Sequence, residues 1–181
     1  MTFNDLYTRG IIPVTHTVCG MRLLPLSVGH ARILTALGLW SPMLPNETLL
    51  AAFLCSRPHR DFSRLWGTRR LLWSLRLWAW RLGGRWDYKR SREVWREYIE
   101  YHTDEPAATF EQSKRTRRTP WVDSLKAALC RYFGYDPMTF DDVPLHQATI
   151  DYSALAELEG SATVINASIS DMRRLQTVGR G

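Results

Sequence analysis

Apolar residues recur at helical spacing along most of the chain, and prolines and glycines divide this pattern into segments. Apolar positions three or four residues apart are typical of a helix that buries one face. The pattern predicts helices over residues 27–40, 46–56, 61–82, 88–102, 121–134 and 144–160. The sequence therefore predicts a mainly α fold, a compact domain of about five to six helices with short irregular or extended terminal segments.

Several helix boundaries follow from individual residues. The hydroxyl of Ser27 can accept from an otherwise unpaired backbone N–H, so we expect it to cap the first helix, with His30 packing or capping beside it. Asn46 is expected to cap the second helix, and Gly83 and Gly84 to end the third. Thr119 and Pro120 form a favoured helix start before residue 121.

The buried positions are predicted from the same spacing. In the helix over residues 88–102, the apolar positions are Val94, Trp95, Tyr98, Ile99 and Tyr101. In the helix that follows residue 120, Trp121 begins a stripe with Leu125 and Leu129, and we expect it to lie in the core.

The chain divides into four parts that we expect to form one integrated domain. Proline, small polar residues and the basic cluster Lys114–Arg118 mark residues 103–119 as a linker. Residues 11–14 and 162–169 are predicted as short extended segments. The four parts are an N-terminal helical part (1–102), the linker (103–119), a C-terminal helical pair (120–160) and a tail (161–181).

Two runs of sequence carry a resemblance. Residues 23–58 read LLPLSVGHARILTALGLWSPMLPNETLLAAFLCSRP, and residues 121–160 read WVDSLKAALCRYFGYDPMTFDDVPLHQATIDYSALAELEG. These runs, somewhat under half of the chain, resemble small helical proteins encoded beside the tail genes of bacterial prophages. Such proteins are considered tail assembly chaperones. The resemblance implies a non-enzymatic protein that binds a tail component such as the tape-measure protein.

The resemblance does not explain the Arg/Trp belt between these runs, residues 64–86, which read RLWGTRRLLWSLRLWAWRLGGRW. Such a belt can be a buried helix whose arginine stems reach water, or a protein-binding surface, since Trp and Arg dominate binding hot spots. It can also bind nucleic acid or lie on an anionic membrane. We predict that the partner-binding residues are Trp66, Arg69, Trp73 and Arg76.

Charge is distributed unevenly along the chain, whose net charge is +6. Residues 57–97 hold 12 Lys and Arg against 4 Asp and Glu, whereas residues 121–159 hold 2 against 7. Opposite charge on two lobes favours association with a partner or with a second copy, because complementary potentials speed docking and fix its register. Two solvated faces of unlike sign explain the pattern equally well.

The sequence offers little catalytic chemistry. It lacks a glycine-rich phosphate loop, a Gly-x-Ser-x-Gly elbow and a His-Glu-x-x-His motif, so we expect no enzyme activity and no cofactor. Asp136, Asp141 and Asp142 are interpreted as capping or solvated loop residues. Zinc-type ligands occur as His16 with Cys19 and Cys55 with His59. Buried free cysteines are the commoner outcome of this spacing, so we expect no metal.

The compartment follows from what the sequence lacks. No stretch approaches the roughly 20 apolar residues of a membrane span, and the N-terminus has no secretory-signal pattern. Three widely spaced cysteines do not form a disulfide framework. We therefore expect a cytoplasmic protein, and the resemblance implies that it acts as a tail assembly chaperone in the cytoplasm of a host cell. The alternative is a basic nucleic-acid-binding accessory protein, with residues 57–96 and Lys114–Arg118 as its footprint.

Overall fold

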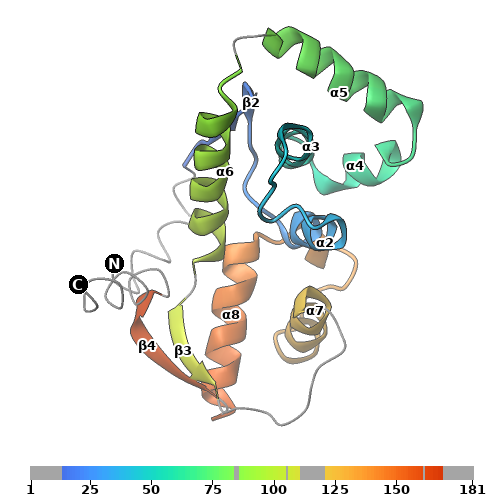
Figure 1. Cartoon of the computed structure of the whole chain (residues 1–181). Coiled ribbons are helices and arrows are strands. Elements are labelled where there is room, and N and C mark those ends of the chain that lie inside the picture. Colours follow the sequence, from blue (N-terminus) through green and yellow to red (C-terminus); the bar gives the residue numbers. More distant parts are fainter. Residues whose placement is uncertain (1–13, 84–85, 105, 111–120, 161, 169–181) are drawn as a thin grey trace, which may run out of the picture.

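Helices dominate the structure, a computed structural model that describes residues 14–83, 86–104, 106–110, 121–160 and 162–168 (Figure 1). The helices are α2 (Val28–Leu37), α3 (Pro45–Cys55), α4 (His59–Leu65), α5 (Arg69–Leu82), α6 (Tyr88–Thr103), α7 (Trp121–Tyr132), α8 (Leu145–Leu158) and the 3₁₀ helix η2 (Phe140–Asp142). The strands are β1 (Thr17–Val18), β2 (Met21–Arg22), β3 (Pro106–Phe110) and β4 (Ala162–Ser168). The predicted mainly α fold is confirmed.

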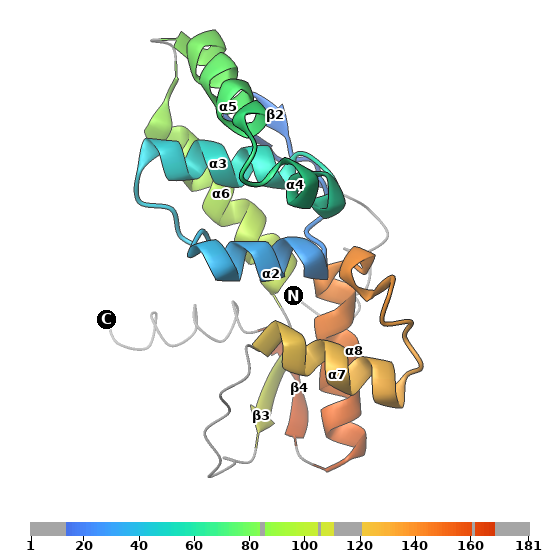
Figure 2. The same ribbon diagram turned by 90° about the vertical axis from the view of Figure 1, so that its right-hand side faces the viewer.

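The molecule is longer in one direction than in the others. Figures 1 and 2 show α5 at one end and the β3–β4 pair at the other, with α2 between the two halves. One cluster of buried apolar side chains nevertheless runs through both halves, from Val18 and Phe53 to Leu129 and Leu145. The described residues therefore share a single core.

Helix α6 passes through the middle of this core. Its buried face comprises Ser91, Trp95, Tyr98 and His102, which follow at helical spacing. The indole of Trp95 donates to the Trp40 carbonyl (3.2 Å), and the Tyr98 hydroxyl donates to the Leu24 carbonyl (2.8 Å). Both aromatic side chains thus bury apolar area while their polar atoms stay paired. Of the five predicted apolar positions, Trp95 and Tyr98 are thus buried, whereas Val94, Ile99 and Tyr101 are half-buried.

The segment predicted as one helix over residues 61–82 forms two helices instead. Helix α4 ends at Leu65, and the joint after it contains Gly67, which has a φ of 74°. Glycine adopts this left-handed conformation without strain. A right-handed helix cannot continue through a residue in that conformation, so the helical path ends there. The described residues consequently contain seven α-helices, one more than the six segments predicted.

The predicted linker contains a strand. Residues 106–110 form β3, which pairs antiparallel with β4, with Phe110 opposite Ala162 and Ala108 opposite Val164. The strand predicted over residues 162–169 is confirmed as β4. Its partner lies more than 50 residues earlier in the chain, so local sequence gives no sign of the pairing. The remaining linker residues, 111–119, and the expected helix start at Thr119 and Pro120 lie outside the described residues.

Two further local expectations are wrong. Helix α3 begins at Pro45, two residues after Met43, and Glu47 rather than Asn46 caps it by accepting from the backbone N–H groups of Met43 and Leu44. Trp121 is 46 % exposed, and the next residue, Val122, takes the buried position with Leu125 and Leu129. Neighbouring residues point about 100° apart on a helix, so Trp121 turns toward solvent when Val122 faces the core.

No helix in the described part of the chain is long and apolar enough to cross a membrane. The predicted extended segment at residues 11–14 lies mostly outside the described residues, and Val14 itself is not in a strand.

Candidate functional site

The outer face of α5 exposes large apolar side chains. Trp73 is 68 % and Trp80 is 80 % exposed, and Leu72 and Leu77 beside them are also more than half exposed. Arginines lie on the same face. We define the outer face of α5 as the six residues Arg69, Leu72, Trp73, Arg76, Leu77 and Trp80.

The opposite, inner face of α5 holds the helix on the protein. Leu71 is buried, and Leu75, Trp78 and Leu82 pack at helical spacing against the core. Helix α5 contacts α3, and the Trp78 ring and a methyl group of Leu82 approach Gly20 in the turn between β1 and β2. Because packing uses only the inner face, the tryptophans and leucines of the outer face do not help α5 to fold.

The structure places the four predicted partner-binding residues in two groups. Arg69, Trp73 and Arg76 lie together on the outer face of α5, and all are exposed. Trp66 follows the end of α4, before the break at Gly67, so the helical spacing that links it to Trp73 in the sequence does not exist. Trp66 is half-exposed and packs on Phe62, with ring centroids 5.2 Å apart.

The predicted set omitted three residues of the outer face: Leu72, Leu77 and Trp80. Counting in steps of three and four from Trp73 leads to Arg76, Leu77 and Trp80, so the sequence holds the signal. It is hidden because the inner face is apolar too, and a helix that is apolar on two sides shows no single amphipathic stripe. Only the packing on α3 separates the two faces.

A cleft of about 680 Å³ lies between α2, α4 and α7. Ile33, Leu37, Phe62 and Val122 contribute to its apolar lining, and Trp66 stands at its border. Charged side chains of three elements surround it, among them Arg32, Arg60, Asp123 and Asp141.

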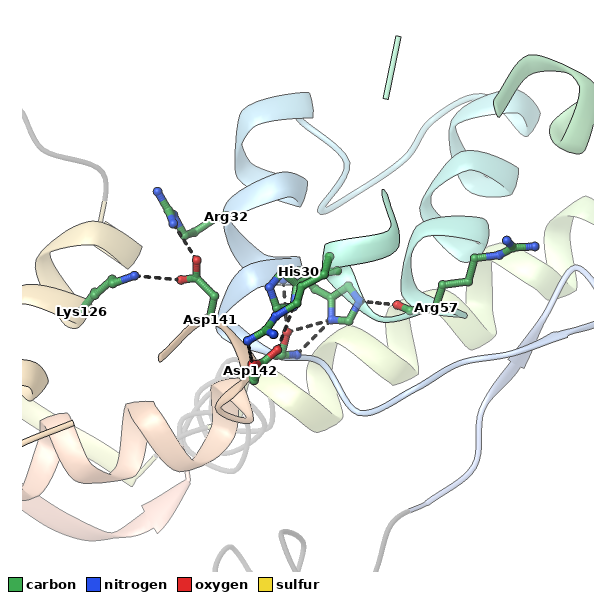
Figure 3. A network of polar contacts seen from close by, with 9 residues as sticks. His30, Arg32, Arg57, Lys126, Asp141 and Asp142 are labelled. Carbon is green, nitrogen blue, oxygen red and sulfur yellow. Dashed lines mark hydrogen bonds and ion pairs between the residues drawn. The ribbon is translucent and has the colours of Figure 1, made fainter. Parts of the chain in front are cut away.

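Ion pairs neutralise most of this charge (Figure 3). Arg32 binds Asp123 (3.1 Å) and Asp141 (3.0 Å), and Asp141 also contacts Lys126 (3.4 Å). Arg60 pairs with Asp142. These contacts join α2, α4, α7 and η2, so Asp141 and Asp142 connect elements rather than only capping a loop. Asp136, which accepts from the backbone N–H of Met138 (2.9 Å), acts as predicted.

A buried histidine fixes the start of α2 beside the end of α3. The backbone N–H of Ser27 donates to His30 Nδ1 (3.3 Å), so Nδ1 carries no proton, and His30 Nε2 donates to the Arg57 carbonyl (2.7 Å; Figure 3). The Ser27 hydroxyl completes the capping box by accepting from the His30 N–H (3.4 Å). The predicted cap is confirmed. Burial lowers the pKa of His30 to about 4.

This contact joins two segments of the first resembling run, residues 27–30 and 55–58. His30 comes from the first segment and the Arg57 carbonyl from the second. The second resembling run joins at the same place, because Leu145 N donates to the Leu26 carbonyl (2.8 Å) and Val28 N to the Val143 carbonyl (2.9 Å). The residues that carry the resemblance therefore build the junction of α2, α3 and α8. Ser27 and His30 are both buried, and their hydrogen bonds to each other serve to cap α2.

Gly29 allows α2 and α4 to approach each other closely at this junction. A Cβ atom there would lie 2.5 Å from the His59 ring, well inside van der Waals contact. We expect Gly29→Ala to lower the free energy of unfolding by about 1–3 kcal/mol, the typical cost of overpacking, although alanine favours a helix over glycine.

Urea unfolding of three proteins tests this expectation: wild type, Gly29→Ala, and Gly29→Ala combined with His59→Ala. The double variant removes the clashing ring and is expected to recover most of the loss. A single variant as stable as wild type would show that α2 and α4 are not packed this closely.

The four candidate zinc ligands do not form one site, because each has its own surroundings. Cys55 is fully buried at the end of α3, which raises its pKa to about 12, and burial raises the pKa of Cys19 to about 11. His59 faces Asp142 on η2 (3.6 Å), and His16 packs edge-on against Tyr98 (5.5 Å). Within the described residues, no group of three or more His, Cys, Asp or Glu side chains is arranged to hold a metal ion.

No protein-family model matches the chain, and no curated protein or solved structure shows significant similarity to it.

Proposed function

We propose that this protein binds other proteins through the outer face of α5 and acts, as its sequence resemblance implies, as a tail assembly chaperone in the host-cell cytoplasm. The exposure of Trp73, Leu77 and Trp80 carries the proposal. An apolar ridge that the fold itself does not use marks an interaction site.

The partner that fits this proposal is the tape-measure protein, a long helical protein. Its apolar stripe needs a temporary cover until the tail tube forms around it. A ridge of tryptophan and leucine on a projecting helix can pack against such a stripe, as helices do in coiled-coil packing. The resemblance of residues 23–58 and 121–160 to tail assembly chaperones supplies the second support.

Nucleic acid binding is the second candidate, because arginines line the same face. Phosphate binding needs exposed arginines, and stacking on bases needs exposed aromatic rings. It does not need Leu72 and Leu77, which expose aliphatic surface. The leucines therefore favour a protein partner over nucleic acid.

Co-expression with a tape-measure protein tests the proposal. We expect that protein to remain soluble with the wild type and to aggregate with the double variant Trp73→Ala/Arg76→Ala. Truncating such anchors typically costs 2 kcal/mol or more, about thirtyfold in affinity.

Trp121→Ala/Arg131→Ala is the matched control, since it removes one exposed Trp and one exposed Arg from α7. It should keep the tape-measure protein soluble. Equal solubility with both double variants, or no co-purification with the wild type, would reject the proposal. RNA or DNA that co-purifies and is released by high salt would support the second candidate.

A further inference from the structure

In the part of the chain that the structure describes, the arginines of α5 have no acidic partners. No Asp or Glu occurs between Asp61 and Asp87 in the sequence. Among the described residues, none of the four arginines of α5 lies within 4.0 Å of a carboxylate: Arg69, Arg70, Arg76 and Arg81. The arginines around the cleft, Arg32 and Arg60, are by contrast paired. No carboxylate among the described residues therefore offsets the positive charge of α5.

Charge and apolar surface alternate along the outer face with a regular spacing. Arg69 and Arg76 are seven residues apart, and so are Trp73 and Trp80. Seven residues of helix correspond to about 10 Å along its axis. A partner that satisfies both sets needs an apolar stripe and carboxylates that recur at about the same interval. A second helix with a heptad pattern meets this requirement.

We propose that the outer face of α5 selects an acidic amphipathic helix, with Leu, Phe or Met in its apolar stripe and Asp or Glu flanking it one heptad apart. This inference rests on the binding site of the proposed function but not on the identity of the partner. Charge complementarity of this kind sets which partner binds and in which register.

Other occupants fit the outer face less well. A helix on an anionic membrane keeps its basic residues opposite or beside its apolar stripe. Here Arg76 lies between Trp73 and Trp80 on the exposed side, and the opposite side of α5 is packed on α3. A second α5 is also disfavoured, because the arginines of the two helices would repel each other.

Two designed peptides without tryptophan provide the test. Both are three heptads long with leucine at positions a and d, and they differ only in having Glu or Lys at the flanking positions. Binding is read from the tryptophan fluorescence of the full-length chain. We expect the Glu peptide to bind at least tenfold more tightly than the Lys peptide in low salt, and the difference to shrink as salt is raised.

Variants separate the two components of recognition. Arg69→Glu/Arg76→Glu should reverse the preference between the two peptides. Trp73→Ala/Trp80→Ala should weaken binding of the Glu peptide at least tenfold while circular dichroism still shows the wild-type helical content. Equal affinity for both peptides would overturn the inference.

Competing occupants give different results. The inference is also overturned if phosphatidylglycerol vesicles or an oligothymidylate shift the tryptophan fluorescence and the Glu peptide does not. The inference is overturned, too, if the chain forms concentration-dependent oligomers that the double variant Glu157→Lys/Glu159→Lys dissociates. The occupant would then be the acidic end of α8 in a second copy. If the Glu peptide binds but the tape-measure protein never co-purifies, only the proposed function fails. If the tape-measure protein binds through α5 but the Glu peptide does not, only this inference fails.

Discussion

Replacing Trp95 by alanine is expected to lower the free energy of unfolding by about 3–5 kcal/mol, whereas the same replacement at Trp80 should change it by less than about 0.5 kcal/mol. Trp95 is 1 % exposed and its indole pairs with the Trp40 carbonyl, so its loss leaves a cavity and an unpaired acceptor. Trp80 is the most exposed of the large apolar side chains on α5. Urea unfolding followed by circular dichroism measures both values.

The contrast between the two tryptophans matters more than either value. Both are among the six tryptophans that lie within residues 66–95, and composition alone does not distinguish a buried one from an exposed one. A large loss of stability on replacing Trp80 would mean that the outer face of α5 is packed in solution, and the candidate site would be lost. A small loss on replacing Trp95 would contradict the position of α6 in the core.

Acid is expected to destabilise the protein by about 3 kcal/mol through His30 alone. Burial lowers the pKa of His30 from 6.5 to about 4. Between these two pH values the unfolded chain binds a proton that the folded chain does not, so stability falls as the pH falls. The contribution of His30 is fully present above about pH 6.5 and lost below about pH 4. Urea unfolding at a series of pH values measures the slope.

The variant His30→Gln isolates this contribution. Glutamine at the same capping position can still accept from the Ser27 N–H, as in an ordinary capping box. Burial also lowers the pKa of His16 and His59, so the variant should keep part of the slope. The difference in the free energy of unfolding between wild type and variant should change by about 3 kcal/mol between about pH 6.5 and pH 4. Parallel curves would show that His30 is not buried as a neutral side chain.

The sequence predicted those features that neighbouring residues determine. Ser27 caps α2 because its partner lies three residues away, and α6 has the predicted bounds to within one residue because its apolar face is regular. Composition left open whether the Arg/Trp belt is buried or exposed, and in the structure three of the four predicted residues lie on one exposed helix face.

The features that sequence reasoning missed depend on distant contacts or on a single backbone angle. The Arg57 carbonyl reaches His30 only after α2 and α3 fold back on each other, and β3 needs β4 as its partner. The break at Gly67, with its positive φ, separates Trp66 from the outer face of α5, which carries the other three predicted residues. The cleft and its ion pairs join α2, α4, α7 and η2, and no spacing in the sequence indicates that these elements meet.

Hydroxyl-radical footprinting of the chain with and without the tape-measure protein tests the central claim most directly, because it reports the exposure of individual side chains. In the free chain, Trp73 and Trp80 should be oxidised rapidly and Trp95 slowly, in line with their exposures of 68 %, 80 % and 1 %. We expect the partner to protect Trp73 and Trp80 while leaving the oxidation of Trp121 on α7 unchanged. Protection of Trp121 with continued oxidation of Trp73 and Trp80 would show that the partner binds elsewhere and contradict the account.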